Sequence, residues 1–203
     1  MKKLKIYAIA DIHGAQHRLN LVLKNIQKHN PDLVAVCGDI TQYGPGDVAK
    51  NFLDQIPTET VAVTGNIDSP DVKKGIDNSK ATRIELKRIV KKGMPFVGTS
   101  GINPDDFKII SDKKLIDDKT ILVTHVPAYD TVDKIFIGMH GGSKELRILV
   151  DKYKPRLVLS GHIHEDPGFK KIKDTVFVNC SIGKRGEGAL IDINDNISVK
   201  MLE

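Results

Sequence analysis

The chain has 203 residues, of which 40% are hydrophobic and 28% are charged, and its net charge is +5. This size and composition fit one globular domain over residues 1–203 and exclude a largely disordered chain. No apolar run approaches the ~20 residues of a membrane-spanning helix, so we expect no membrane partner. The apolar run after the first lysines stops at Asp11, which favours a first strand over a signal peptide and predicts a cytoplasmic protein.

The positive charge is scattered along the chain in lysine pairs and forms no basic arm. A solvated basic surface with a modest attraction for anionic substrates accounts for this distribution, which by itself does not indicate nucleic-acid binding. Cys37 and Cys180 lie inside apolar runs, so we expect two buried free thiols and no disulfide.

The first half of the chain alternates apolar runs with helical patterns. Strands are expected over 4–10, 33–37 and 59–65, with helices over 15–30 and 47–56. In the first helix Leu19, Val22, Leu23 and Ile26 recur at helical spacing, and Asn30-Pro31 ends the pattern. This order predicts a mainly parallel sheet with helices packed against it.

The second half contains shorter apolar runs with less helical periodicity. Short strands are predicted in four segments, which a second sheet would accommodate: 83–90, 94–100, 107–111 and 119–125. A long loop over 126–142 precedes a helix over 143–153, for which Ser143 is the expected N-cap. Strands and hairpins follow over 156–161, 175–180 and 188–203, so we expect two packed mixed sheets with helices outside.

Polar residues follow five of the expected strands, usually beside a glycine. They are Asp11 and His13, Asp39, Asn66 and Asp68, His125, and the pair His162 and His164. In open α/β sheets, ligands bind at the carboxyl ends of the strands, so these ends are expected to converge on one crevice. Each signal alone is typical of an ordinary turn. Five such signals in order indicate a functional site.

The chemistry of these side chains points to metal ions. Carboxylates, imidazoles and an amide oxygen suit ions such as Mn, Fe, Co, Ni or Zn. They are too numerous for one tetrahedral zinc, and no cysteine accompanies them. Seven ligands can hold two ions if one carboxylate bridges, and two ions ~3.5–4 Å apart can clamp a phosphoryl group and generate a hydroxide.

These motifs together resemble those of the calcineurin-like metallophosphoesterase superfamily. The resemblance spans residues 11–164 and rests on Asp11-x-His13, Gly38-Asp39, Gly65-Asn66, His125 and Gly161-His162-x-His164, in the superfamily's order. It implies a four-layer α/β/β/α sandwich in which two mixed β-sheets are flanked by helices. It also implies a hydrolase that cleaves phosphoric esters with a hydroxide held between two divalent ions, manganese among the candidates.

The resemblance further implies a role for each ligand. Asp11, His13 and His164 would bind the first ion, whereas Asn66, His125 and His162 would bind the second. Asp39 would bridge both ions. Asn66 and His125 are also predicted to act in catalysis, and Asn66 to contact the substrate.

The sequence departs from the superfamily pattern at Ile67. Many members carry a histidine there, directly after the asparagine, and that histidine is the usual candidate for protonating the leaving group or holding a phosphate oxygen. Isoleucine can do neither, and losing a general acid costs ~10²–10⁴-fold in rate, less for a good leaving group. This favours a phosphodiester substrate with an easy leaving group, or a substitute residue.

His140 is the predicted substitute acid, because it lies in the long loop directly before a predicted helix start. Gly141, Gly142 and Ser143 could offer backbone N–H groups to a phosphate there. A solvated loop histidine with an ordinary glycine-rich helix entry is the alternative. Asp68 could orient a metal-binding histidine or cap a following helix. The segment 183–188, "GKRGEG", could touch an anionic substrate or form a hairpin turn.

A metal-dependent phosphodiesterase acting on a small phosphoester or nucleotide-like substrate is the favoured function. A small nuclease is an alternative, but the chain has no room for a separate nucleic-acid-binding domain and no run of interleaved basic and aromatic residues. A non-catalytic metal-binding or protein-interaction scaffold is the other alternative, since the same fold serves that way in a retromer subunit with a decayed metal set. Here all seven ligands are present. The physiological substrate, the native metal and the oligomeric state, including a homo-oligomer, stay open.

Overall fold

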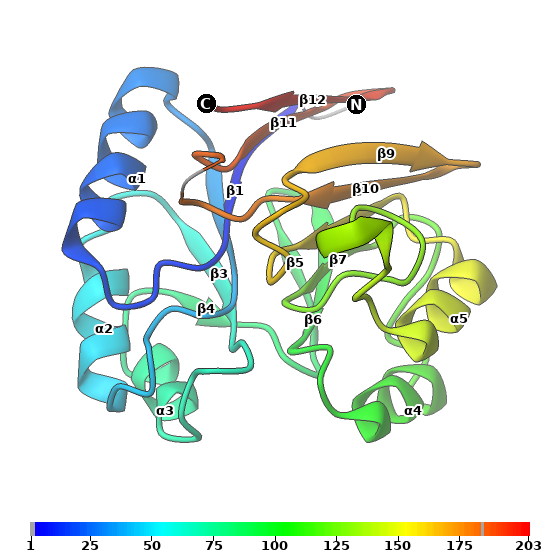
Figure 1. The fold of residues 1–203 in the computed structure, drawn as a ribbon, viewed down its shortest axis with the longest axis horizontal. Coiled ribbons are helices and arrows are strands. Elements are labelled where there is room, and N and C mark those ends of the chain that lie inside the picture. Colours follow the sequence, from blue (N-terminus) through cyan, green and yellow to red (C-terminus); the bar gives the residue numbers. More distant parts are fainter. Residues whose placement is uncertain (1–2, 184) are drawn as a thin grey trace.

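A computed structural model describes residues 3–183 and 185–203. Two six-stranded β-sheets pack face to face, and helices cover both outer faces. Figure 1 shows α1, α2 and α3 on one outer side and α4 and α5 on the other. The predicted four-layer α/β/β/α sandwich is confirmed. Within the described ranges, no helix has the length and apolar character needed to cross a membrane.

The first sheet contains the N-terminal strands and the C-terminal hairpin. Its strands, in spatial order, are β12 (Ile197–Met201), β11 (Ala189–Ile193), β1 (Leu4–Ile9), β2 (Leu33–Cys37), β3 (Thr60–Val63) and β4 (Thr82–Arg83). The pairs β1–β2, β2–β3 and β3–β4 are parallel, whereas β11 pairs antiparallel with β1 and β12. The carboxyl ends of β1, β2 and β3 therefore share one edge.

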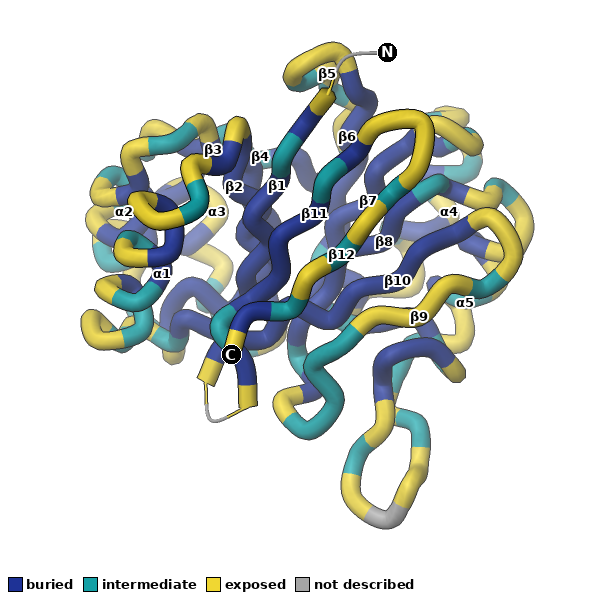
Figure 2. The backbone as a smooth tube through the Cα atoms, turned by 90° about the horizontal axis from the view of Figure 1, so that it is seen from above, coloured by how far each residue is buried: buried dark blue, intermediate teal, exposed yellow. Residues whose placement is uncertain are grey.

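The second sheet is built from the middle of the chain. Its strands, in spatial order, are β5 (Arg88–Lys91), β6 (Met94–Thr99), β7 (Ile121–Thr124), β8 (Leu157–Ser160), β10 (Thr175–Asn179) and β9 (Gly168–Ile172). The four inner strands are parallel, and β5 and β9 add antiparallel edges. Figure 2 shows that the edge strands β9 and β12 are largely exposed, whereas inner strands such as β2, β3, β8 and β10 are buried.

Five α-helices and one 3₁₀ helix are present in the described chain. They are α1 (Gln16–His29), α2 (Gly46–Asp54), α3 (Val72–Asp77), α4 (Pro104–Asp112), α5 (Lys144–Tyr153) and η1 (Phe136–Gly138). The predicted end of α1 is confirmed, since Asn30 adopts a left-handed conformation (φ 47°) directly before Pro31. The predicted N-cap of α5 is also confirmed, because Ser143 Oγ accepts a hydrogen bond from Leu146 N at 3.0 Å.

Three hydrophobic cores hold the four layers together. Alternate residues of β1 point to opposite faces, so Ile6 and Ala8 join the core between the sheets, whereas Tyr7 and Ile9 pack under the helices α1–α3. The third core lies between the second sheet and α4 and α5. Strands buried on both faces read as continuous apolar runs, which is why they were predictable from the sequence.

Two predicted strands are wrong. The single strand expected over 83–90 is instead two short strands, β4 and β5, which lie in different sheets. Residues 107–111 belong to helix α4. Asn103 caps this helix by accepting a hydrogen bond from Asp105 N at 3.1 Å, and Pro104 occupies its first turn. Phe107 and Ile110 then fall on one face and are buried against the second sheet. Helix α3 and strand β9 were not predicted from the sequence.

Candidate active site

The predicted strand ends meet at the shared edge of the two sheets. Asp11 N donates to Gly38 O at 3.1 Å, and His13 N donates to Asp39 O at 2.9 Å, which joins the ends of β1 and β2. In the second sheet, Gly161 N donates to His125 O at 3.0 Å. The topology thus brings residues from both sheets to one place.

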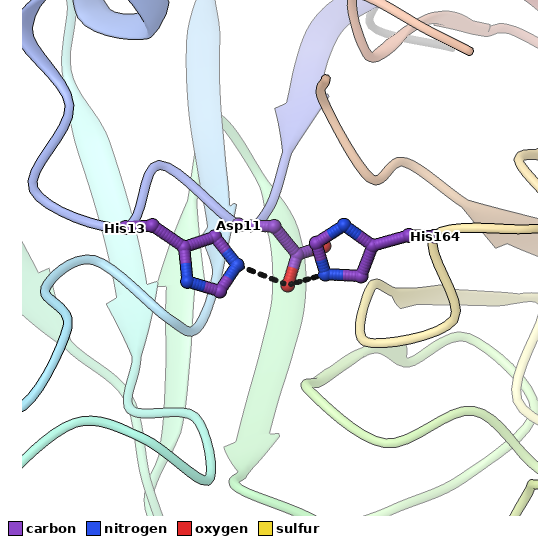
Figure 3. A group of neighbouring side chains, drawn as sticks. All are labelled: Asp11, His13 and His164. Carbon is purple, nitrogen blue, oxygen red and sulfur yellow. Dashed lines mark ion pairs between the residues drawn. The ribbon is translucent and has the colours of Figure 1, made fainter. Parts of the chain in front are cut away.

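Asp11, His13 and His164 form the first group of potential metal ligands. Figure 3 shows the Asp11 carboxylate between the two imidazoles, with Oδ1 3.8 Å from His13 Nε2 and 3.6 Å from His164 Nε2. The other carboxylate oxygen, Oδ2, accepts hydrogen bonds from Ser181 Oγ at 2.6 Å and His162 N at 3.2 Å. These bonds fix the orientation of the carboxylate and leave Oδ1 toward the imidazoles.

Two buried atoms of this group have no hydrogen-bond partner among the described residues, Asp11 Oδ1 and His13 Nε2. An unpaired buried polar atom is costly, so such atoms require an explanation. Burial lowers the pKa of His13, the carboxylates of Asp11 and Asp39 raise it, and Arg18 lowers it further; the net shift is downward. A neutral imidazole nitrogen and a carboxylate oxygen are suitable ligands for a divalent cation, which would satisfy both atoms.

The second group contains Asp11, Asp39 and His125, so the Asp11 carboxylate belongs to both groups. His125 is fully buried, and its Nε2 lies 3.4 Å from Asp39 Oδ2 and 2.7 Å from Asn66 Oδ1. The ring of His162 packs edge-on against the ring of His125 with centroids 5.0 Å apart. The structure therefore brings all seven predicted ligands to one edge.

His125 is surrounded by hydrogen-bond acceptors. Its Nδ1 lies 2.9 Å from Cys37 O, a carbonyl that can only accept, so Nδ1 carries a proton. Its Nε2 lies near oxygens of both Asn66 and Asp39, and a second proton or a cation at Nε2 would satisfy this arrangement. Burial opposes the charged ring, yet Asp39 and Asp11 outweigh burial and raise the pKa of His125. A metal ion at Nε2 would replace the second proton.

The electrostatics of the neighbouring ligands fit the same interpretation. Burial would raise the pKa of Asp39, but hydrogen bonding and charge from His125 and the Ile67 N–H keep it below its ordinary value. Burial lowers the pKa of His162, and the nearby His125 lowers it further. Asp39 is therefore a carboxylate and His162 a neutral imidazole at neutral pH, which are the forms that bind metals.

The turns before the ligands depend on close backbone packing. Gly38 has a φ of 87°, and a Cβ there would lie 2.8 Å from His125 Cβ. A Cβ on Gly65 would overlap Asp39, and one on Gly161 would overlap Ala10. Four of the predicted ligands themselves adopt positive φ: Asp11 (66°), His13 (54°), Asp39 (50°) and His162 (69°). Such conformations recur at functional sites, where surrounding structure enforces them.

Asp68 braces two of these turns and caps no helix. Its carboxylate accepts hydrogen bonds from Thr41 N at 2.8 Å, Thr41 Oγ1 at 2.9 Å, Ile40 N at 3.2 Å and Gly65 N at 2.9 Å. The expected helix cap is wrong, since α3 begins after Asp71 and has no side-chain cap. Asp68 thus ties the Asp39 turn to the Asn66 turn without contacting a histidine.

Ile67 lies between these turns and is half-buried. Its backbone N–H donates to Asp39 Oδ1 at 3.1 Å, and its carbonyl accepts from Tyr43 N at 2.9 Å. The position therefore fixes the Asp39 carboxylate through its backbone, while its side chain offers no proton.

His140, the predicted substitute acid, contacts aspartates of its own loop. Its Nδ1 lies 2.7 Å from Asp133 Oδ1, and its Nε2 lies 3.7 Å from Asp130 Oδ1. No hydrogen bond or ion pair within the described ranges joins it to the seven ligands. Gly141 N donates to Asp133 O at 2.9 Å and Gly142 N to Asp133 Oδ2 at 2.9 Å. A phosphate at Gly141 would have to displace such a bond.

Three residues that support the site were not found from the sequence. Ser181 holds the Asp11 carboxylate, Arg18 Nη1 donates to Asp11 O at 2.5 Å, and the buried Asp133 organises the loop around His140. Ser181 does follow an expected strand, as the ligands do, and this was the available signal. Nothing in the local sequence distinguishes Arg18 from other helix arginines.

The structure also bears on the segment 183–188 and on the two cysteines. The hairpin interpretation of 183–188 is confirmed for the described residues on either side of position 184, since Ile182 pairs with Glu187 and Gly183 N donates to Gly186 O at 2.8 Å. Lys184 lies outside the described residues. Cys37 and Cys180 are buried free thiols, as expected.

Comparison with known proteins identifies the family. A family model described as calcineurin-like phosphoesterase matches residues 4–166. An uncharacterized protein of Methanocaldococcus jannaschii is 32% identical over 202 residues, which cover 89% of this chain and 89% of that protein. The chain belongs to the calcineurin-like phosphoesterase family. The resemblance seen in the motifs is thereby confirmed.

One further relative and one solved structure show how far this likeness extends. A Synechococcus protein named a probable cyclic nucleotide phosphodiesterase is 23% identical over 176 residues, which cover 73% of this chain and 64% of that protein. A dimetal phosphatase from Danio rerio shares the fold with a TM-score of 0.65 at 11% identity, covering 98% of this chain and 95% of that chain. At this identity the comparison with the fish phosphatase shows the fold alone.

Proposed function

We propose that the chain is a phosphodiesterase that works with two divalent metal ions. Asp11, His13 and His164 would hold one ion, and Asn66, His125 and His162 the other. Asp39 would lie between them. The observation that carries the proposal is the pair of overlapping ligand groups that share Asp11 and contain buried ligand atoms without hydrogen-bond partners.

Bound divalent ions supply the positive charge that activates a water molecule and stabilises the phosphoryl oxygens during displacement. The residues of the chain supply orientation. Cys37 O holds the His125 ring so that Nε2 points to the centre, and Ser181 holds the Asp11 carboxylate. Asp68 fixes the turns that carry Asp39 and Asn66. The site is therefore preorganised on strand ends rather than on a mobile loop.

The preference for diesters rests on Ile67. Its half-buried apolar side chain stands where a proton donor is common in the superfamily, so departing alcohols must be good leaving groups. The relative named as a probable cyclic nucleotide phosphodiesterase supports the same substrate class.

The test is hydrolysis of bis-p-nitrophenyl phosphate and p-nitrophenyl phosphate by protein stripped of metal and reloaded with Mn²⁺, Ni²⁺, Co²⁺ or Zn²⁺. We expect metal-dependent turnover with a higher kcat/KM for the diester. Asp39→Asn should lower that value at least ~10²–10³-fold, the loss that follows removal of one strong electrostatic contact. The matched control is Asp118→Asn, an exposed aspartate outside both ligand groups.

Three results would contradict the proposal. Absence of turnover with every ion would exclude the enzyme and favour the scaffold alternative, provided that metal still binds. A higher kcat/KM for the monoester would exclude the diester preference. Equal activity of Asp39→Asn and the control would remove Asp39 from the centre.

A further inference from the structure

A cavity of about 410 Å³ opens beside the metal ligand His164. Its walls come from α1, from η1, from the residues after His164 and from the hairpin 182–187. The size is that of a small-molecule site. Because His164 belongs to both the cavity and the first ligand group, a substrate at the metals extends naturally into this space.

Two arginines line this cavity, and both are held by backbone carbonyls. Arg18 Nη1 donates to Asp11 O at 2.5 Å, and Arg185 Nη1 donates to Glu165 O at 2.9 Å. Neither guanidinium forms an ion pair with a described carboxylate. Arg18 also lies against the hairpin, since a Cβ on Gly183 would be 3.6 Å from Arg18 Nη2. Each arginine is anchored through one nitrogen and keeps other N–H donors for a ligand.

The remaining wall has a different chemistry. Phe136 from η1 is 74% exposed, and Pro167 faces the same cavity, so the wall offers apolar surface next to the two cations. Glu165 also lines the cavity and opposes part of the positive charge, which leaves two cations against one carboxylate among the described lining residues. This combination fits an organic group that carries an anion.

We propose that this cavity binds a phosphate group carried on one ester arm of the substrate, with Arg18 and Arg185 as its donors. The planar fork of a guanidinium matches phosphate oxygens, and two forks at one cavity select a doubly charged group over a neutral one. The inference rests on the proposed function, since it names the diesters that the centre would prefer: those with a second phosphate.

The test measures binding by calorimetry on metal-loaded protein, with adenosine 3′,5′-bisphosphate and adenosine 5′-monophosphate as probes. The second phosphate should tighten binding about tenfold, the effect of one charge-assisted hydrogen bond. Arg185→Gln should lower the ratio of the two dissociation constants toward 1, while the remaining arginine keeps part of the preference. Arg18→Gln should do the same, and the ratio is the readout because Arg18 also contacts the Asp11 turn.

The matched control is Arg156→Gln, which removes the same charge at the opposite end of β8 from His162. This variant should keep the wild-type ratio. A ratio near 1 in the wild type would overturn the inference. Equal weakening of both nucleotides by Arg185→Gln would also overturn it, because that arginine would then serve the phosphate at the metals.

Diester hydrolysis measured on the same samples separates this inference from the proposed function. Turnover of bis-p-nitrophenyl phosphate with a wild-type ratio near 1 would overturn only the cavity assignment. A high ratio in a protein without turnover would support the anion site and overturn the phosphodiesterase.

Discussion

The two sheets contribute different chemistry to the site that they share. The first sheet provides the carboxylates Asp11 and Asp39, the amide Asn66 and one imidazole, His13, whereas the second provides only imidazoles. Asp11 and Asp39 are 0% and 3% exposed, but the side chain of His164 is 44% exposed. The negative charge thus lies deep in the first layer, and the second layer adds three imidazoles that range from the fully buried His125 to the exposed His164. Neither layer alone has the charge and the ligand number for two ions.

The largest expected effect on kcat/KM comes from replacing the buried carboxylate of Asp11. It should exceed the effect of replacing the exposed imidazole of His164. Asp11→Asn removes a charge common to both ligand groups and should lower kcat/KM for bis-p-nitrophenyl phosphate by about 10³-fold. His164→Ala removes one peripheral ligand of one group and should cost about 10–100-fold, as losing a supporting metal contact does. Steady-state kinetics at saturating metal measures both. A loss in His164→Ala as large as in Asp11→Asn would refute the comparison.

Metal binding should stabilise the contact between the two sheets. The resulting increase in Tm should become larger as pH rises. At a metal concentration of ~100 Kd the native state gains about 2.7 kcal/mol, which raises Tm by about 5–10 °C for a chain of this length. The pKa of His125 is raised above 6.5 in the metal-free fold. Its protonation therefore stabilises that fold at low pH, and this contribution is lost as pH rises through the folded-state pKa. Metal needs the ring with Nε2 deprotonated, so the shift should widen as pH rises.

Differential scanning fluorimetry from about pH 6 to about pH 8, with Mn²⁺ or with chelator, measures this prediction. Asp11→Asn is the control and should show little metal-induced shift. A shift that is constant across the pH range, or that shrinks as pH rises, would contradict competition between a proton and the ion.

A smaller effect is expected for Asp68, whose hydrogen bonds hold the turns that carry Asp39 and Asn66. Asp68→Asn keeps the shape of the side chain but weakens the bonds to Thr41, Ile40 and Gly65. Metal affinity should fall about 10–100-fold, measured by titration of the metal-free protein. Asp71→Asn is the matched control, because Asp71 braces Gly46 at the start of α2 and contacts no ligand turn. Equal affinities in the two variants would show that Asp68 does not position the ligands.

The smallest effect is expected at His140. Both of its ring nitrogens face aspartates of the loop, so His140→Ala should change kcat far less than the ~10²–10⁴-fold cost of removing a general acid. The pH profile of kcat decides the question. A large loss together with a displaced limb of the profile would instead make His140 the acid that the sequence analysis predicts.

The seven proposed ligands could be brought together from the sequence because each lies shortly after a strand. An apolar run ending in Gly-Asp or Gly-His is a local pattern, and parallel strands bring such ends together without any knowledge of packing. The first-sheet strands were predictable for the same reason, since burial on both faces leaves continuous apolar runs.

The features that could not be predicted from the sequence are of two kinds. Some are contacts between residues far apart in the chain, and others are short elements with an ambiguous apolar pattern. Ser181 holds a carboxylate 170 residues away, and its position after an expected strand does not identify that partner. Helix α4 spans nine residues, and its apolar positions Phe107 and Ile110 also suit a short strand. Only the cap at Asn103 and the proline after it distinguish the two. The cavity needs four separate segments, so it exists only in the folded chain.

The left-handed backbone at Asp11, His13, Asp39 and His162 favours particular amino acids at these positions. Aspartate, asparagine and histidine tolerate this conformation better than other side chains. Glutamate and cysteine also carry good metal-binding atoms, yet they lack that tolerance. Two requirements therefore limit the choice of amino acids at these positions: the side chain must suit a metal ion, and the backbone must adopt the left-handed conformation. Efforts to change its metal preference should begin with exchanges among these three residues.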